Sequence, residues 1–385
     1  MSIKDIMAQV PSVTEQPWTP KAVFDGCSGE VATAAYDTEV DLDDAEAIDQ
    51  IIRDAGLDPQ RVMCVEHPRV STWDVPGHGR QWAYKLKLAP RSKSRTDVDR
   101  IMQGIEPAAP KVRKRGSHWA TVQIGDVHIG KSAEAGGGTE SILKRYKAML
   151  DNALDELNLC DPAGIEGVHV AFVGDMIEGV VSQGGRNIAL MDLTLTEQIT
   201  VATRLTVQTI RTFADAGYQV KVSAIGGNHG DTQRVQGQPL GDNHDVGIAV
   251  GACDLLAELP QYGDVVDLVV PPRDQSYMTF GVGDTTFVSA HGHSFGRGSS
   301  PIAKAEAWWA GQALSGTPAA AGQVLMCGHF HTFHHANIAA GKTCIYSPSM
   351  ETLSRWFHER TGATSDRGAA FYLTSAGRVS HMTII

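Results

Sequence analysis

The feature that most constrains this chain is a series of polar residues that each follow an apolar, strand-like segment. In order, Asp126 and His128 follow Trp119–Ile124, Asp175 and Glu178 follow His169–Val173, Asn228 and His229 follow Gln219–Ile225, His291 follows Thr286–Ala290, and His329 and His331 follow Gln323–Cys327. Ligands of open α/β sheets bind at the carboxyl ends of the strands. We therefore expect these side chains to meet at one edge. Their oxygen and nitrogen atoms would suit Mn²⁺, Fe²⁺ or Zn²⁺ rather than Ca²⁺.

The segments between these motifs predict helices and further strands. We expect helices at Ser141–Leu159, Thr194–Phe213 and Pro301–Leu314, the second begun by a capping box of Thr194 and Glu197. Further strands are predicted at Val265–Val270, Met278–Val282 and Ala369–Thr374. Strand–helix alternation followed by runs of strands predicts an α/β fold, a two-sheet β-sandwich flanked by helices.

The chain upstream of the first motif predicts separate parts. Residues 1–20 read as a flexible arm and residues 21–88 as a small α+β accessory module. Within that module, Val31–Tyr36 and Trp82–Leu88 alternate like strands, and Asp43–Ala55 reads as a helix stopped by Gly56. Residues 89–117 are basic and proline-bearing, which predicts a linker before a main domain at 118–385.

Composition limits the environment and the partners. No apolar run reaches the ~18 residues of a membrane span, and the N-terminus does not resemble a signal peptide, so we expect a cytoplasmic protein without a membrane partner. Six scattered cysteines argue against a disulfide framework or a CxxC zinc module and indicate reduced, mostly buried thiols. A formal net charge of −11 argues against a general DNA-coating protein.

The ordered motifs G-D-x-H, G-D-x-x-E, G-N-H, H-G-H and G-H-x-H, within about residues 118–350, resemble those of the calcineurin-like metallophosphoesterases. The resemblance implies that core fold and two divalent metal ions, Mn²⁺ above Fe²⁺, Zn²⁺ or Mg²⁺. It assigns Asp126, His128 and His331 to the first ion, Asn228, His291 and His329 to the second, and Asp175 to a bridge between them.

The same resemblance gives His229 and Glu178 catalytic roles. His229 would donate a proton to the leaving oxygen, and Glu178, longer than the family's Asp, would orient it. His293 reads as a supporting residue, while His334 and His335 read as strand residues near the site. The segment Gly241–Asp245 is either part of a substrate groove or a plain helix N-cap at Asp242 or Asn243.

Departures from the family pattern bear on the substrate. Gly179 stands where serine/threonine phosphatases carry an arginine that clamps a phosphomonoester, and Gly230 stands where an acid is usual. The pattern is nearest to the DNA-repair exonuclease (SbcD-like) branch. Only about fifty residues follow His331, so we expect no ATPase partner and a phage-type, stand-alone nuclease.

A basic segment supports nucleic acid as the partner. Ten basic residues lie between Lys85 and Arg115, and Arg113, Lys114 and Arg115 are the predicted substrate-binding residues, with Trp73, Trp82 and Tyr84 able to stack on bases. The plain alternative is a solvated linker. The function expected is hydrolysis of nucleic-acid phosphodiesters by a metal-activated hydroxide, as a DNA exonuclease or endonuclease. The alternatives are a phosphodiesterase of cyclic or di-nucleotides, a phosphomonoesterase, or a metal-free binding subunit.

Overall fold

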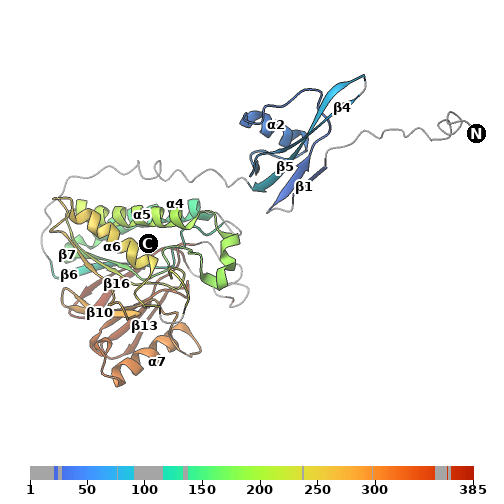
Figure 1. The fold of residues 1–385 in the computed structure, drawn as a ribbon. Helices are drawn as coiled ribbons and strands as arrows, with labels where there is room; N and C mark the ends of the chain where they lie inside the picture. Colours follow the sequence, from blue (N-terminus) through green and yellow to red (C-terminus); the bar gives the residue numbers. More distant parts are fainter. Residues whose placement is uncertain are drawn as a thin grey trace, which may run out of the picture. The chain divides into compact units, whose positions relative to one another are not determined.

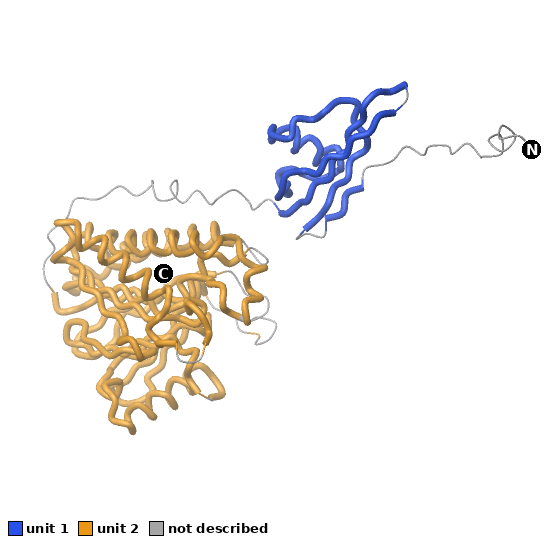
Figure 2. Tube along the Cα trace, in the orientation of Figure 1, with its two compact units in different colours: residues 1–97 blue, residues 98–385 orange. Residues whose placement is uncertain are grey.

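The computed structural model describes residues 21–24, 28–75, 77–90, 116–132, 138–235, 238–296, 298–351, 362 and 366–385. The chain divides into two compact units, residues 1–97 and 98–385, shown in blue and orange in Figure 2. The boundary lies within the predicted linker.

The first unit is a five-stranded sheet with one helix. Its strands are β1 (Lys21–Phe24), β2 (Gly29–Ala32), β3 (Val62–Cys64), β4 (Arg69–Val75) and β5 (Gly79–Pro90), and its helix is α2 (Ala45–Asp54). β5 is central and pairs with β2, β3 and β4. Ile51 and Ile52 of α2 pack with Val31, Tyr84, Leu86 and Leu88. The predicted strand Val31–Tyr36 is wrong at both ends: β2 begins at Gly29 and ends at Ala32, and Tyr36 makes only an isolated bridge to Trp82. The predicted linker start is also early, because β5 continues through Ala89 and Pro90 to pair with β3.

The second unit contains two sheets. The first has the order β16-β15-β6-β7-β8-β9, and the second has the order β10-β11-β12-β14-β13. The bounds are β6 (His118–Ile124), β7 (Ile165–Phe172), β8 (Gln219–Ala224), β9 (Val266–Val269), β10 (Tyr277–Val282), β11 (Thr285–Ala290), β12 (Val324–Cys327), β13 (His334–Ala339), β14 (Lys342–Tyr346), β15 (Ala370–Ser375) and β16 (Arg378–Ile384). β6 to β9 are parallel, as are β11, β12 and β14.

Helices cover the outer face of each sheet. The helices are α4 (Gly138–Cys160), α5 (Leu195–Asp215), α6 (His244–Ala257) and α7 (Pro301–Leu314), with 3₁₀ turns η1 (Asp161–Ala163), η2 (Ser182–Leu190) and η3 (Pro318–Ala321). Figure 1 shows α4, α5 and α6 over the first sheet and α7 against the second. The predicted capping box at Thr194 and Glu197 is confirmed. The side chain of Ser300 caps the N-terminus of α7.

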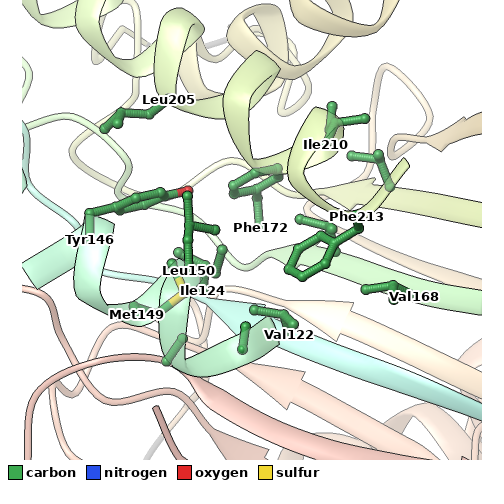
Figure 3. Close-up of a cluster of buried hydrophobic side chains, with 14 of the residues drawn as sticks. Val122, Ile124, Tyr146, Met149, Leu150, Val168, Phe172, Leu205, Ile210 and Phe213 are labelled. Carbon is green, nitrogen blue, oxygen red and sulfur yellow. The ribbon is translucent and has the colours of Figure 1, made fainter. Parts of the chain in front are cut away.

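The largest hydrophobic cluster lies between the first sheet and its helices (Figure 3). Val201, Leu205 and Phe213, spaced four and eight residues apart, lie on one apolar face of α5 that turns toward the sheet. They meet Val122 of β6 and Phe172 of β7, both at most 2 % exposed. This packing buries the outer face of the first sheet.

A second cluster joins the inner faces of the two sheets. Val173, Phe280, Phe287, Met326 and Tyr372 are among its members. Gln123 of β6 crosses between the sheets: its amide donates to the carbonyls of Cys327 (3.0 Å) and Ile345 (3.1 Å). The predicted fold class, an α/β fold built on a two-sheet sandwich flanked by helices, is confirmed.

None of the helices in the described residues is long and apolar enough to cross a membrane. Cys64, Cys160, Cys253, Cys327 and Cys344 are free thiols, all but Cys64 buried, while Cys27 lies outside the described residues.

Candidate metal centre

Five loops at the carboxyl ends of β6, β7, β8, β11 and β12 carry the predicted metal ligands. The first predicted ligand of each loop lies one to four residues after the end of its strand. Seven non-glycine residues in the described parts of the chain have positive φ, and five of them are predicted ligands: Asp126, His128, Asp175, His329 and His331, with φ between 51° and 75°. Left-handed backbone is uncommon for such residues and collects at functional sites, where the surrounding structure holds it in place.

Glycines let these loops approach one another. A Cβ on Gly227 would lie 2.1 Å from Oδ1 of Asp175, and a Cβ on Gly328 would lie 2.9 Å from Oδ2 of Asp126. The glycines before Asn228 and His329 therefore have a packing reason. Each leaves room for a carboxylate of a neighbouring loop.

Asp126, His128 and His331 form the first ligand group, with one donor atom of each within 4.8 Å of the others. The Nε2 atoms of His128 and His331 lie 3.2 Å apart, and Asp126 Oδ1 is 3.5 Å from the second of them. Nδ1 of His128 is 3.0 Å from Glu178 Oε2, and Nδ1 of His331 is 2.6 Å from Glu351 Oε1. A carboxylate that accepts a hydrogen bond from Nδ1 keeps the ring proton on Nδ1 and leaves a lone pair on Nε2. The Nε2 lone pairs of both histidines are therefore free to bind one metal ion, as in carboxylate–histidine–metal arrangements.

Asp175, His291 and His329 form the second ligand group. Nδ1 of His291 donates to the Val173 carbonyl over 2.7 Å, while its Nε2 lies 3.0 Å from Asp175 Oδ2. Asn228 lies between Gly227 and His229, which both contact Asp175. The two groups are joined by the backbone N–H of His329, which donates to both oxygens of Asp126 at 3.0 and 2.8 Å.

The donor set fits two divalent cations. Oδ1 of Asn228 is buried without a hydrogen-bond partner, and Nε2 of His291 faces the Asp175 carboxylate at 3.0 Å. A buried polar atom left unpaired is costly, and a bound cation would relieve that cost. Asp126, Asp175, Glu178 and Glu351 are each at most 5 % exposed. Burial lowers the pKa of His291, but the Asp175 carboxylate raises it to about 10 overall, which reflects this excess of negative charge. Buried carboxylates at this density require cations to balance them.

His229 and Glu178 lie at the rim of the first group. The backbone N–H of His229 donates to Asp175 Oδ1 (2.7 Å), and its Nδ1 donates to the Glu178 carbonyl (2.9 Å). Glu178 Oε2 is 3.4 Å from that nitrogen but 3.0 Å from His128 Nδ1. Burial raises the pKa of Glu178, yet hydrogen bonds from the two histidines hold it below its usual range. Glu178 therefore contacts both His229 and the predicted metal ligand His128.

Sequence reasoning missed several supporting residues. Asp245, buried at the start of α6, accepts hydrogen bonds from the backbone N–H groups of Asp175 (2.8 Å), Met176 (3.1 Å) and Gly227 (3.0 Å). Glu351, which contacts His331 and the ammonium of Lys131, follows no motif. For Asp245 a signal existed, because it ends the polar segment Gly241–Asp245 before a predicted helix. In that segment the N-cap interpretation is confirmed for Asn243.

Both departures from the family pattern have packing reasons. A Cβ on Gly179 would lie 1.9 Å from the carbonyl oxygen of His229, so no side chain fits there without moving the loop that carries His229. A Cβ on Gly230 would lie 2.4 Å from Asn243 Oδ1 and 2.5 Å from Asp245 Oδ2. Asp245 therefore occupies the space that a side chain at position 230 would take.

A cavity of about 200 Å³ adjoins the second group, and its lining includes His293, Gln275 and Arg234. The His293 ring centroid lies 5.4 Å from that of His291. Arg234 donates to the Asn228 carbonyl over 2.5 Å and to Asp231 over 3.2 Å. His334 and His335 are strand residues of β13, as predicted. Arg113, Lys114 and Arg115 lie outside the described residues.

Comparison with known proteins gives weak structural likenesses. No protein-family model matches the chain, and no curated protein matches it. Among solved structures, Vps29 from Entamoeba histolytica complexed with Zn²⁺ is 14 % identical, with 66 % of this chain and 84 % of that one covered and a TM-score of 0.29. A predicted phosphoesterase from Streptococcus pneumoniae is 9 % identical (66 % and 82 % covered, TM-score 0.25). Phosphopantetheinyl hydrolase from Mycobacterium tuberculosis is 13 % identical (65 % and 95 % covered, TM-score 0.27). At these scores the function has to be inferred from the site itself.

Proposed function

We propose that this protein is a calcineurin-like metallophosphoesterase that uses two divalent metal ions to hydrolyse phosphodiesters. The observation that carries the proposal is the pair of ligand groups, Asp126, His128 and His331 beside Asp175, His291 and His329, at one end of the sandwich. Their oxygen and nitrogen donors suit Mn²⁺ best, with Fe²⁺, Zn²⁺ or Mg²⁺ as alternatives. When bound, two such ions neutralise the charge of the phosphate and lower the pKa of the attacking water.

Other residues of the chain position the ligands or supply a proton. Glu178 and Glu351 hold the rings of His128 and His331 in place, and Asp245 holds the loop of Asp175. His229 has its Nδ1 engaged by the Glu178 carbonyl, which leaves Nε2 to give a proton to the leaving oxygen. Its side chain is 16 % exposed, so a substrate can reach it.

Gly179 favours a diester over a monoester. A phosphomonoester dianion is recognised well by a bidentate arginine. The residue after Glu178 cannot supply one, because the His229 carbonyl lies within 1.9 Å of any Cβ there. A diester carries one negative charge fewer and needs no such clamp.

A metal-dependence assay tests this proposal. The purified chain should lose hydrolysis of bis-p-nitrophenyl phosphate on chelation and regain it with Mn²⁺, and should act more slowly on p-nitrophenyl phosphate. Asp126→Asn should be inactive, whereas Asp267→Asn, which removes an exposed carboxylate paired with Lys221, should match the parent. Hydrolysis that survives chelation, or a monoester preference, would contradict the proposal.

For the natural substrate we propose nucleic acid, with the chain acting in the cytoplasm as a stand-alone nuclease of the SbcD-like kind. The support is the density of basic residues between Lys85 and Arg115. Each phosphate contact releases about one condensed counterion, so log affinity should fall with log salt by roughly 0.7–0.9 per contact. Changing Arg113, Lys114 and Arg115 to alanine should flatten that slope by up to about 2–3.

The same triple variant should cleave DNA or RNA more weakly at moderate salt yet hydrolyse bis-p-nitrophenyl phosphate as the parent does. A double change of Lys144 and Lys147 to alanine, on the exposed face of α4, is the control for loss of basic residues elsewhere on the surface. An unchanged salt slope in the triple variant would mean that the segment is a solvated linker.

The cavity beside the second group favours a second candidate, hydrolysis of a cyclic or di-nucleotide. Its volume of about 200 Å³ and its lining by Arg234 and Gln275 suit one anionic polar group of a small substrate. Arg234→Gln should then raise KM for such a substrate by about 10-fold, the value of one charge-assisted hydrogen bond. Arg80→Gln, a surface change in the first unit, is the control. If Arg234→Gln leaves KM unchanged, this candidate fails.

A further inference from the structure

Three potential metal ligands outside the centre converge where α4 ends beside β16. Glu156 and Cys160 are four residues apart on α4, so they lie on one face of the helix. His381 comes from β16. One donor atom of each residue, a carboxylate oxygen, the thiol sulfur and an imidazole nitrogen, lies within 4.8 Å of the other two.

A β-bulge aims His381 toward the helix. Phe371 pairs with Thr383 and Leu373 with Ser380, so His381 and Met382 together oppose the single residue Tyr372. The φ of His381 is 47°, in the left-handed region. Bulges commonly redirect a side chain in this way. Here the imidazole Nε2 comes to 2.7 Å from Glu156 Oε2.

The donor set has the chemistry of a zinc site. Zn²⁺ binds thiolate sulfur at about 2.3 Å and imidazole nitrogen or carboxylate oxygen at about 2.0–2.2 Å. Tetrahedral coordination then places a nitrogen and an oxygen donor roughly 3.3 Å apart, so the present 2.7 Å needs a small opening. Cys160 is 6 % exposed while the side chains of Glu156 and His381 are 25 % and 36 % exposed, which leaves the outer side to water.

We propose that Glu156, Cys160 and His381 form a third metal site, separate from the centre, that takes one Zn²⁺ or a similar borderline-soft divalent ion with water as its fourth ligand. On binding, the Cys160 thiol loses its proton to solvent and its sulfur coordinates the ion, with no change of oxidation state. The ion would fasten β16, the edge strand of the first sheet, to the end of α4. This site would stabilise the C-terminal hairpin rather than take part in hydrolysis.

Cobalt substitution separates this site from the centre, because thiolate ligation of Co²⁺ gives a near-ultraviolet charge-transfer band that oxygen and nitrogen ligands do not give. Titration of the full chain with Co²⁺ should develop this band. The band should persist in an Asp126→Asn, Asp175→Asn double variant, whose centre is disabled, and should saturate there at one equivalent per chain. It should disappear in Cys160→Ser and in His381→Gln.

Two matched controls should keep the band. Cys253→Ser removes another buried thiol, and Asp155→Asn removes an exposed carboxylate one residue from Glu156. Circular dichroism should show that each variant is folded, and Zn²⁺ should raise the Tm of the double variant more than that of the same chain with His381→Gln. No band in the parent, or a band that survives in folded Cys160→Ser and His381→Gln, overturns the proposal. Hydrolysis of bis-p-nitrophenyl phosphate should be unchanged in His381→Gln, so the outcome is independent of the proposed function.

Discussion

The two ligand groups of the centre hold their histidines in different ways. In the first group a carboxylate contacts each ring: Glu178 contacts His128, and Glu351 contacts His331. In the second group the ring of His291 donates to the neutral backbone carbonyl of Val173. A carboxylate behind a histidine increases its basicity as a ligand. We therefore expect the first group to bind its proposed ion more tightly. The second group borders the cavity through His293.

The largest effect on metal content and hydrolysis is expected from Asp175→Asn, which should affect both ligand groups at once. Asp175 belongs to the second group and is the proposed bridge, and a neutral amide cannot join two cations as a carboxylate does. Both ions should be lost together and hydrolysis should fall to background. Metal analysis that still finds two ions per chain would contradict the bridging role, with Asp267→Asn as the control for loss of one carboxylate.

His229→Ala tests whether chemistry and metal ligation are separate. Turnover on a poor leaving group should fall by about 10²–10⁴-fold, the usual value of general acid catalysis, while metal content stays near that of the parent. The loss should be smaller for p-nitrophenolate, which needs little protonation. Steady-state rates on both substrates would reveal an equal loss, and that result would rule out the proton-donor role.

Glu351→Gln tests whether the two ligand groups differ in their affinity for metal. It keeps the shape of the side chain that contacts His331 but weakens the carboxylate support of the first group. Affinity for one of the two ions should fall by about 10–100-fold, as for other residues that support a ligand, and affinity for the other ion should change little. Calorimetric titration with Mn²⁺ resolves the two steps, and Glu306→Gln on α7 is the control. Equal weakening of both steps would mean that the groups do not differ in this way.

The smallest effect concerns His169, a core histidine with no carboxylate beside it. It lies between the sheets, with Nε2 2.8 Å from Ser223 Oγ and its ring against Phe280 and Phe287. Burial lowers its pKa to about 3 from an ordinary value of 6.5. The unfolded chain takes up a proton below about pH 6.5 and the folded chain does not, so stability should fall as pH falls through that range.

Between pH 7 and 5.5 this histidine should cost the parent about 1 kcal/mol of unfolding free energy. His169→Gln can keep a hydrogen bond to Ser223 and should lose that part of the pH dependence. Urea unfolding of both chains at the two pH values measures the difference. An identical pH dependence would show that His169 is already protonated in the folded state.

The elements that the sequence predicted well are those with long-range regularity. The apolar stripe and capping box of α5 gave its start at Thr194, and the five apolar strands before the motifs lie where they were expected. The first unit was harder: short β1 and β3 and the exposed β4 carry little periodicity, and β2 ends earlier than the alternation indicated. Their positions depend on pairing with β5.

The sequence by itself determined which residues would gather, because a polar side chain placed directly after a parallel strand can only lie at the carboxyl edge of the sheet. Only the tertiary structure decided how they are held. Glu351 and Asp245 lie 20 residues after His331 and 70 after Asp175, and no local pattern links such pairs. The tertiary structure also explains Gly179, since the carbonyl of His229 lies where a side chain would go. Contacts of this kind arise only when separate loops pack together, so they follow from the packing of the two sheets and not from any single segment.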